Sequence, residues 1–315
     1  MLDVRRLQML RAVSREGSLS AAARALGYTQ PAVSHHIARL EEEIGTALLT
    51  RFGRGVRLTD AGVALVDHAD AVLSRLDAAE EEVAAIAGLR AGRVRLAAFA
   101  SGSATLLAGA LARLREAHPG VELTFVEAEP QDGLELLRAG ETDLVLAFSY
   151  EAVGERDGKD ITTVPLLRDP SHAILPAAHP EAGEDGPIDL GSLAGEAWIA
   201  GCERCRRHLL HVAADAGFAP RIDFETDDYL TVQSLVASGL GVSLLPALAL
   251  VSARRDDVAV RPVAGRPARA IAAVLPTAER RPPAVTAALA ALEGAAAEMS
   301  TDAHATSLGL ELTAR

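Results

Sequence analysis

The stretch GSLSAAARALGYTQPAVSHHIA, residues 17–38, decides the fold of the first part of the chain. Ser18 or Ser20 can cap a short helix, because a hydroxyl oxygen accepts hydrogen bonds from free first-turn amides. Gly27 can end that helix with left-handed backbone angles, and Pro31 suits the first turn of a second helix. The second helix has an inward-facing apolar stripe: Val33, Ile37, Leu40 and Ile44. This pattern predicts a helix-turn-helix that enters the major groove of DNA.

The flanking segments extend this prediction. Residues 2–15 carry a buried stripe of Leu7, Leu10 and Val13, which predicts a third helix behind the pair. After Gly45, glycines at positions 53 and 55 permit a hairpin tip that is surrounded by three arginines: Arg51, Arg54 and Arg57. We therefore expect a β-wing that lies against phosphate groups.

In this region the chain resembles the LysR-type bacterial transcriptional regulators. The motifs are AAARALGYTQPAVSHHIARLEEEIG (21–45), LLTR (48–51) and VRLTDAG (56–62). The resemblance implies a winged helix-turn-helix, a linker helix, and an α/β effector domain of two lobes that is similar to type 2 periplasmic binding proteins. A three-helix bundle without a DNA role is the alternative. The residues expected to bind DNA are Ser18, Thr29, Gln30, Pro31, Ser34, His35, Arg39, Arg51 and Arg54.

Charge is distributed unevenly along the chain. The whole sequence has 31 Lys and Arg against 43 Asp and Glu, a formal charge of -12. Residues 1–60 contain nine Arg and six acidic residues, so they carry +3 and the remainder carries -15. A basic head on an acidic body favours DNA contact that is confined to the head.

A long helix is predicted from Asp60, capped by Thr59, to about Leu89. Its apolar residues recur by four and three over three heptads: Leu65, Ala69, Val72, Leu76, Ala79, Val83 and Ile86. The helix could pack against its own body. We favour packing against the same helix of a second chain, because it precedes the body and resembles the family's dimerising linker. Such a dimer would set the spacing of two heads on a two-fold operator. The residues expected at the dimer seam are Leu65, Val72, Leu76 and Val83.

The rest of the chain alternates strands and helices, which predicts a parallel sheet covered on both faces. The chain is expected to cross between two lobes near residues 164–167 and to return near 266–270. The tail shows no clear pattern and is expected to be mobile. The expected divisions are a head at 1–59 (motif about 18–37), a linker at 60–89, an effector domain at 92–298 and a tail at 299–315. Lobe 1 is expected at about 92–164 and 268–298, and lobe 2 at about 165–267.

A ligand of such a fold is expected between the lobes, at the carboxyl ends of strands and the N-termini of helices. The junction at residues 99–103 offers hydroxyls and first-turn amides that could hold an anion or a carboxylate. Its serines could equally be plain helix caps. Similar junctions between a predicted strand and the segment after it follow Phe148, Ala200 and Glu225. The residues expected to bind an effector are Ser101, Gly102, Ser103, Ser149, Gly201, Cys202 and Thr226.

Two cysteines leave several interpretations open. Cys202 and Cys205 continue into His208 and His211 at steps of three, which suggests a metal site. Because such steps rotate around a helix, the four side chains cannot easily meet one ion. A C-x-x-C at a helix start can also lower a thiol pKa and permit redox switching. Cys202 could instead line the ligand cleft, or both could be ordinary small residues.

Catalysis has no support in the sequence. Gly239 and Gly241 lack the third glycine of a phosphate loop, and no G-x-S-x-G occurs. We expect a non-enzymatic, cytoplasmic regulator without cofactor or metal. The uncharged segment 229–253 is expected to be a buried helix and strand and not a membrane span, because Gly and Pro interrupt it.

The partners expected are double-stranded operator DNA, a small-molecule effector, and RNA polymerase if the protein is an activator. A homodimer is expected from the seam, and a homotetramer from the resemblance. A thiol-based redox regulator that uses Cys202 and Cys205 is the main alternative. A solute-binding protein is an alternative of a different class, which the basic head argues against.

Overall fold

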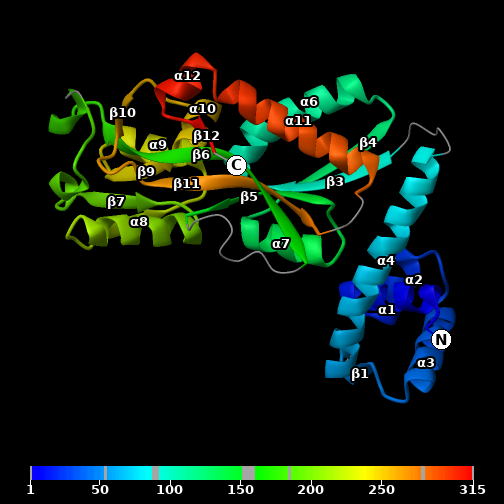
Figure 1. The fold of residues 1–315 in the computed structure, drawn as a ribbon. Coiled ribbons are helices and arrows are strands. Elements are labelled where there is room, and N and C mark those ends of the chain that lie inside the picture. Colours follow the sequence, from blue (N-terminus) through cyan, green and yellow to red (C-terminus); the bar gives the residue numbers. More distant parts are fainter. Residues whose placement is uncertain are drawn as a thin grey trace.

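The computed structural model describes residues 2–52, 55–86, 92–150, 160–183, 186–277 and 281–313. Within these ranges the chain forms a small helical head, a long linker helix and an elongated α/β body (Figure 1). None of the helices in these ranges is long and apolar enough to cross a membrane.

Three helices and a two-stranded wing make the head. Ser18 caps the second helix by accepting a hydrogen bond from the Ala21 amide at 3.1 Å, and Gly27 has the left-handed φ of +70° that the turn needs. Ile44 is exposed, because it lies in the last turn of its helix. The elements are α1 (Val4–Glu16), α2 (Leu19–Ala25), α3 (Gln30–Ile44), β1 (Leu49–Phe52) and β2 (Gly55–Leu58).

The linker helix α4 (Asp60–Ile86) presents different faces to its surroundings. The Thr59 hydroxyl caps it by accepting from the Gly62 amide at 3.0 Å, as the sequence predicts. Ala69 and Leu73 are buried, and Leu65 packs against the core of the head. Three residues of the expected seam are exposed in the single chain, namely Val72 (45%), Leu76 (41%) and Val83 (67%).

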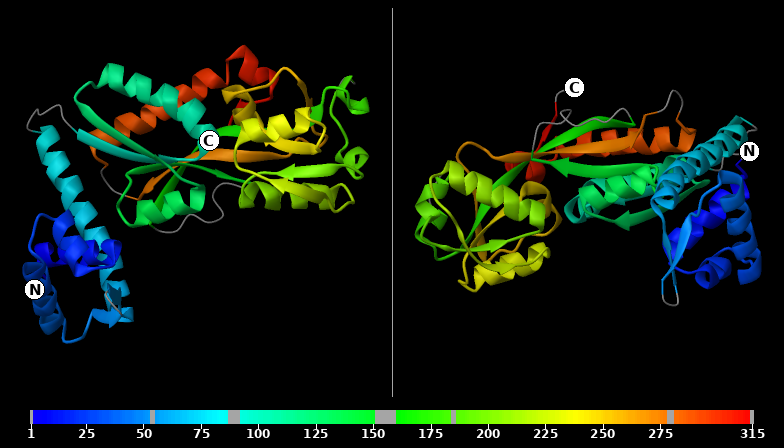
Figure 2. Two further views of the ribbon diagram at one scale, coloured as in Figure 1. Left: turned by 180° about the vertical axis from the view of Figure 1, so that it is seen from behind. Right: turned by 90° about the horizontal axis from the view of Figure 1, so that it is seen from below.

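A twisted sheet runs through the whole body, in the order β4-β3-β5-β11-β6-β9-β7-β8, with β10 and β12 also paired to β6. The long strands β6 and β11 cross between the lobes (Figure 2). The long strand β6 takes part in both lobes: its first part pairs with β11 and its last part with β9 and β10. The strands are β3 (Gly92–Ala98), β4 (Val121–Glu127), β5 (Leu144–Ser149), β6 (Ile161–Pro176), β7 (Ala197–Ala200), β8 (Arg221–Glu225), β9 (Val242–Pro246), β10 (Val258–Pro262), β11 (Ala268–Pro276) and β12 (Glu311–Leu312).

Helices cover both faces of this sheet. In lobe 1, α6 and α11 lie together on one face, and α7 lies on the other (Figure 1). In lobe 2, α8 packs on β7, and α9 packs on β6, β7 and β9. The helices of the body are α5 (Ala100–Gly102), η1 (Ser103–Leu107), α6 (Ala108–Ala117), α7 (Pro130–Arg138), η2 (Pro180–Gly183), η3 (Leu190–Leu193), α8 (Glu203–Asp215), α9 (Tyr229–Ala237), α10 (Ala247–Ser252), α11 (Pro283–Met299) and α12 (Ala303–Ser307).

The expectation of a mobile tail is wrong. Asp302 caps α12 by accepting from two amides, and β12 pairs with β6 at the lobe crossing. Leu308 and Leu310 are buried in the body's core. Residues 300–313 are ordered because these few apolar residues pack into the core at the lobe crossing, a packing that the short local pattern does not predict.

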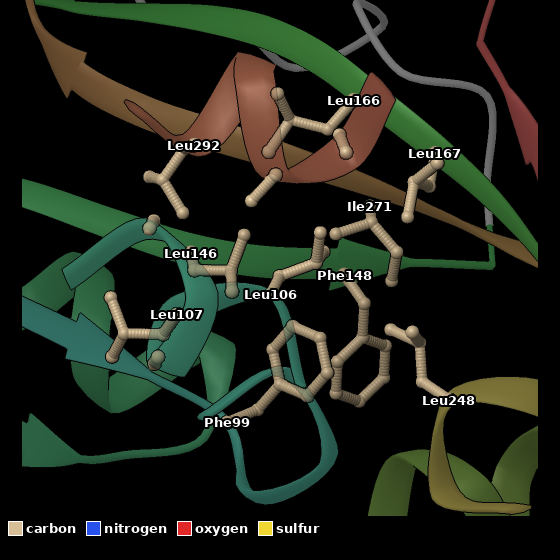
Figure 3. Close-up of a cluster of buried hydrophobic side chains, with 14 of the residues drawn as sticks. Phe99, Leu106, Leu107, Leu146, Phe148, Leu166, Leu167, Leu248, Ile271 and Leu292 are labelled. Carbon is tan, nitrogen blue, oxygen red and sulfur yellow. The ribbon is translucent and has the colours of Figure 1, made fainter. Parts of the chain in front are cut away.

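Leucine and phenylalanine side chains fill the core of lobe 1 up to the lobe crossing (Figure 3). Phe99 and Phe148 meet edge to face with their ring centroids 4.9 Å apart, an arrangement that aromatic pairs prefer. Both lie at the carboxyl-terminal side of a parallel strand, so the core packs directly behind the gap between the lobes.

Candidate functional site

The head presents the start and outer face of α3 to solvent. Gln30 and His35 are exposed, Ser34 is half-buried, and Arg39 is exposed and paired with Glu42 at 2.9 Å. Thr29 precedes α3 without making a side-chain cap. The exposed Pro31 lies in the first turn of α3, and Ser18 caps the start of α2. These placements put polar side chains on the surface expected to face DNA.

The wing is held by contacts that the sequence did not predict. The Glu41 carboxylate on α3 accepts from the Leu48 and Leu49 amides at 2.8 and 3.1 Å, so it fixes the start of β1. The Arg57 guanidinium lies 4.7 Å from the centre of the exposed Phe52 ring. The Arg51 side chain and the whole of Arg54 lie outside the described residues, so their predicted phosphate contacts stay predictions.

A cavity of about 650 Å³ lies between the lobes of the body, a size typical of small-molecule sites. Of the seven residues expected to bind an effector, Ser101 and Cys202 line it. The described lining includes five carboxylates, and no Arg, Lys or His belongs to it. The polar lining consists of Ser101, Glu127, Glu129, Asp132, Cys202, Cys205, Asp227, Asp228, Tyr229 and Ser252.

The other five expected residues have structural contacts instead. A Cβ on Gly102 would lie 2.7 Å from the Phe99 ring, and a Cβ on Gly201 would lie 3.2 Å from Cys205 Cβ. The Ser103 hydroxyl is within donating distance of the main-chain carbonyls of Ala98 and Phe99 at the end of β3, and Thr226 accepts from the Asp228 amide. Ser149 pairs with Ala270 in the sheet. Their position at strand ends is as predicted, but it brings only part of the set into the cavity.

A buried ion pair lies directly behind the cavity, at the lobe crossing. Arg269 of β11 and Asp169 of β6 are completely buried, and Arg269 Nε donates to Asp169 Oδ2 at 2.8 Å. Arg269 Nη2 donates to Ser101 Oγ at 2.7 Å, and its guanidinium packs against both the Phe99 and the Phe148 rings, 4.8 and 4.5 Å from their centroids. Burial raises the pKa of Asp169, against the opposing effect of the arginine.

This arrangement is unlike the anion-binding site expected at residues 99–103. The Ser101 hydroxyl already accepts from Arg269, and the Tyr229 hydroxyl lies 3.5 Å from it. The arginine that could attract an anion is completely buried and bound to Asp169. The cavity therefore meets a ligand mainly through carboxylates, thiols and hydroxyls.

The two thiols lie side by side on the cavity wall. Cys202 Sγ, at the N-cap of α8, donates to Cys205 Sγ at 3.0 Å, and the Tyr150 hydroxyl lies 3.8 Å from Cys205 Sγ. The hydrogen bond from Cys202 lowers the pKa of Cys205 to about 7, helped by Arg269 and Tyr150 and opposed by burial. The same bond raises the pKa of Cys202.

The cysteine–histidine string does not converge on one point. His208 is buried and stacks on Tyr150 with ring centroids 3.7 Å apart, whereas the His211 side chain is 75% exposed. Burial lowers the pKa of His208 to about 4, so it is neutral near pH 7. In the part of the chain that the structure describes, no group of three His, Cys, Asp or Glu is placed to hold a metal ion.

A larger cavity, of about 780 Å³, lies between α4 and lobe 1. Charged pairs close part of it: Arg95 with Asp143 at 2.6 Å and Arg138 with Asp160 at 3.7 Å. We place the candidate effector site in the cleft between the lobes, where strand ends from both lobes meet.

Two families of known sequences match the chain. Residues 4–63 match the bacterial regulatory helix-turn-helix protein of the lysR family, and residues 87–297 match the LysR substrate binding domain. The chain belongs to the LysR family of transcriptional regulators. It is 33% identical to "Probable HTH-type transcriptional regulator LrrA" of Synechococcus elongatus over 252 residues, which cover 79% of this chain and 83% of that relative.

Solved structures of LysR regulators share this fold. A full-length OxyR variant from Pseudomonas aeruginosa is 24% identical with a TM-score of 0.72, over 93% of this chain and 95% of that one. Full-length CbnR complexed with its target DNA is 22% identical with a TM-score of 0.54, over 94% of this chain and 100% of that one. The predicted fold class, with its DNA-binding head and two-lobed effector domain, is confirmed.

The residues that sequence reasoning missed are Glu129, Tyr150, Asp169, Tyr229 and Arg269. Glu129 follows β4 and precedes Pro130, the start of α7, so the strand-end rule used for Ser101 could have found it. Arg269 and Asp169 had no such signal, because the sequence of β11 does not show which residue pairs with Arg269, and Asp169 directly follows another arginine, Arg168, in β6.

Proposed function

We propose that this LysR-type regulator binds a two-fold operator through α3 and the wing, and that a small-molecule effector in the cleft between the lobes controls it. The observation that carries the proposal is the cavity of about 650 Å³ lined from both lobes. A ligand that touches both walls interacts differently with open and closed lobes, and so it can shift their equilibrium. The proposal places the protein in the cytoplasm, with its operator.

In the head, Gln30 and His35 are proposed to read base edges, and a Gln side chain can pair with adenine through two hydrogen bonds. Thr29, Ser34, Arg39 and the wing arginines Arg51 and Arg54 are proposed to contact phosphates. Ser18 and Pro31 are proposed to place the motif against the DNA backbone. Phosphate contacts orient the head, and base contacts provide its specificity.

The assembly proposed is a homodimer through α4, joined into a homotetramer. Val72, Leu76 and Val83 are apolar, exposed in the single chain and spaced along one face of α4. Leu65, expected at the same seam, packs against the head and so contributes less to a dimer contact. If the protein is an activator, RNA polymerase is a further partner.

Selection of genomic DNA tests the first part of the proposal. The purified protein is mixed with fragmented DNA of its source organism, and the bound fragments are sequenced. We expect a small set of fragments that share two half-sites related by two-fold symmetry. Recovery of fragments without a common site would contradict sequence-specific binding.

A cleft-filling variant tests the second part. Ala104 lines the cavity, so Ala104→Trp should occupy it without touching the head. We expect this variant to bind the operator and to lose the transcriptional response of the wild type. Ala112→Trp, on α6 away from the cavity lining, serves as the control. A normal response in Ala104→Trp would place the effector elsewhere.

Thiol redox sensing is a second candidate, favoured by one observation. The two sulfur atoms are 3.0 Å apart, and Cys205 has a pKa of about 7, so a thiolate lies beside a second thiol. An oxidant such as hydrogen peroxide would convert the Cys205 thiolate to a sulfenic acid. Attack by Cys202 would then form a disulfide and release water.

The Cys202→Ser/Cys205→Ser variant separates the two candidates. In a reporter strain, loss of a wild-type peroxide response in this variant would support the redox candidate. We expect the opposite result. Peroxide should not change reporter expression with the wild-type protein, and the variant should respond to the inducing growth condition as the wild type does.

A further inference from the structure

Carboxylates line both walls of the cleft. Glu127, Glu129 and Asp132 come from lobe 1, at the end of β4 and the start of α7. Asp227 and Asp228 come from lobe 2, between β8 and α9. The acidic character therefore belongs to the cavity itself and is shared by the two parts that would move when the lobes close.

Nearby cations do not neutralise this charge within the cavity. Arg269 is completely buried and bound to Asp169 and Ser101. On α8, Arg206 pairs with Glu225 at 2.8 Å and Arg207 pairs with Glu203 at 2.9 Å. The charges of Arg269 and, more weakly, Arg204 act on Glu129, but neither side chain belongs to the described lining.

Glu129 and Asp228 differ in how far the protein satisfies them. Both oxygens of Asp228 already accept hydrogen bonds from the first turn of α9, whereas one oxygen of Glu129 has no donor among the described residues. Hydrogen bonds from the Thr231 and Leu230 amides lower the pKa of Asp228, so it stays ionised near pH 7. Burial raises the pKa of Glu129, the Arg269 charge and a hydrogen bond with the Cys202 side chain oppose this increase, and the Asp227 carboxylate adds to it. Glu129 Oε2 is buried and has no hydrogen-bond partner among the described residues, which is costly for a carboxylate.

We propose that the effector of this cleft is a small organic dication, a compound with amino or guanidinium groups at both ends, which pairs with carboxylates of the two lobes together. The inference rests on the proposed function and names the ligand class of the same site. A primary ammonium group offers three N–H donors and a positive charge, which match a lining whose charged side chains are all carboxylates. A metal ion fits less well, because no three metal-binding side chains of the described residues converge.

The same charges explain how such a ligand would act. Without a ligand, carboxylates that face one another across the cleft repel, and this repulsion favours separated lobes. A dication makes the closed form favourable, because only closed lobes let both of its ends find carboxylates. Its effect on the operator complex is limited by its differential affinity for the open and closed forms.

Calorimetry with three ligands of equal chain length tests the proposal on the full-length protein. The ligands are 1,4-diaminobutane (dication), butylamine (monocation) and succinate (dianion). We expect the diamine to bind at least about ten-fold more tightly than butylamine, and succinate not to bind. Diamine affinity should fall as salt is added, because salt screens exposed charges. Tighter binding of succinate, or no diamine binding at millimolar concentration, would overturn the inference.

Substitutions locate the site. Glu129→Gln and Asp227→Asn should each weaken diamine binding about ten-fold, since each removes one carboxylate from one wall. Glu122→Gln, an exposed position on β4 outside the lining, is the matched control and should bind the diamine like the wild type. Unchanged binding in both cleft variants would contradict the assignment. Binding of an anion that alters operator affinity would contradict the dication inference and leave the proposed function intact. A normal transcriptional response in Ala104→Trp would contradict the proposed function itself.

Discussion

The head and the effector cleft differ in how far apart in the chain their defining residues lie. The head is built within residues 4–58, and its caps, turn and core follow from neighbouring residues. The cleft brings Ser101 together with Tyr229 and Arg269, which are 128 and 168 residues away from it. The head is basic and the cleft is acidic. The geometry of a local motif can therefore be predicted directly from the sequence, whereas a site formed by distant residues depends on the packing of the whole body.

The largest effect is expected at the buried pair behind the cleft. Arg269→Met leaves the Asp169 carboxylate buried without its partner, which should destabilise the body by about 3–5 kcal/mol. Chemical unfolding of the full chain, followed by tryptophan fluorescence from the buried Trp198, measures the loss. Arg255→Met breaks an exposed pair with Asp257 and should leave stability unchanged within error.

A second variant distinguishes an ion-pair effect from a packing defect. Arg269→Met/Asp169→Leu removes both charges, and it should recover part of the stability that the single variant loses. Equal stability of the single and double variants would show that the carboxylate was not the source of the loss.

The seam on α4 should give the next largest effect, on assembly and not on the fold. Leu76→Asp places a charge at an exposed apolar position in both copies, and the loss of two buried leucines should weaken dimerisation by about 3 kcal/mol or more. Sedimentation equilibrium measures the oligomer. Val63→Asp, exposed elsewhere on α4, should leave the oligomer unchanged. An unchanged oligomer in Leu76→Asp would contradict the proposed dimer through α4, and with it the two-fold arrangement of the heads.

Acid should weaken the body through His208. Burial, assisted by His211 and Arg269, lowers its pKa from 6.5 to about 4. Because the unfolded chain binds this proton more readily, the stability it provides is complete above about pH 6.5 and is lost as pH falls towards 4. The difference amounts to about 3 kcal/mol.

Comparison of unfolding free energies at pH 7 and pH 4.5 tests this assignment. Tyr150 stacks on the His208 ring and Ser171 Oγ lies 3.4 Å from its Nε2, so the variant must keep a polar group. The His208→Gln variant lacks the titrating ring, so its stability should fall less than that of the wild type over the same range. Parallel losses in both proteins would assign the acid sensitivity to other groups.

Gln30→Ala should give the smallest change, and it acts on the head alone. The loss of a base contact should weaken operator binding by about 1–3 kcal/mol and relax the sequence preference. Fluorescence anisotropy with the selected operator and with mismatched operators measures both quantities. His211→Ala, exposed on α8, is the control and should bind the operator normally. A Gln30→Ala protein with full selectivity would contradict the assignment of α3 as the reading helix.

The sequence could predict the head, the linker and the alternation of the body, because each depends on spacing within one element. Ser18, Gly27 and Thr59 have the capping and turn roles predicted for them. The cleft was predicted only in part: Ser101 and Cys202 line it, but its charge was expected to suit an anion. No local sequence pattern predicts the pairing of Arg269 with Asp169 or of β12 with β6, since both depend on contacts between distant strands.

The measurement that tests the central claim most directly is a footprint of the selected operator with the Glu129→Gln/Asp227→Asn variant. These substitutions remove facing charges from the two walls of the cleft without adding a ligand or touching the head. If repulsion across the cleft controls how the heads are placed, the variant alone should give the footprint that the wild type gives with 1,4-diaminobutane. A variant footprint identical to that of the ligand-free wild type, and still altered by the diamine, would contradict the account.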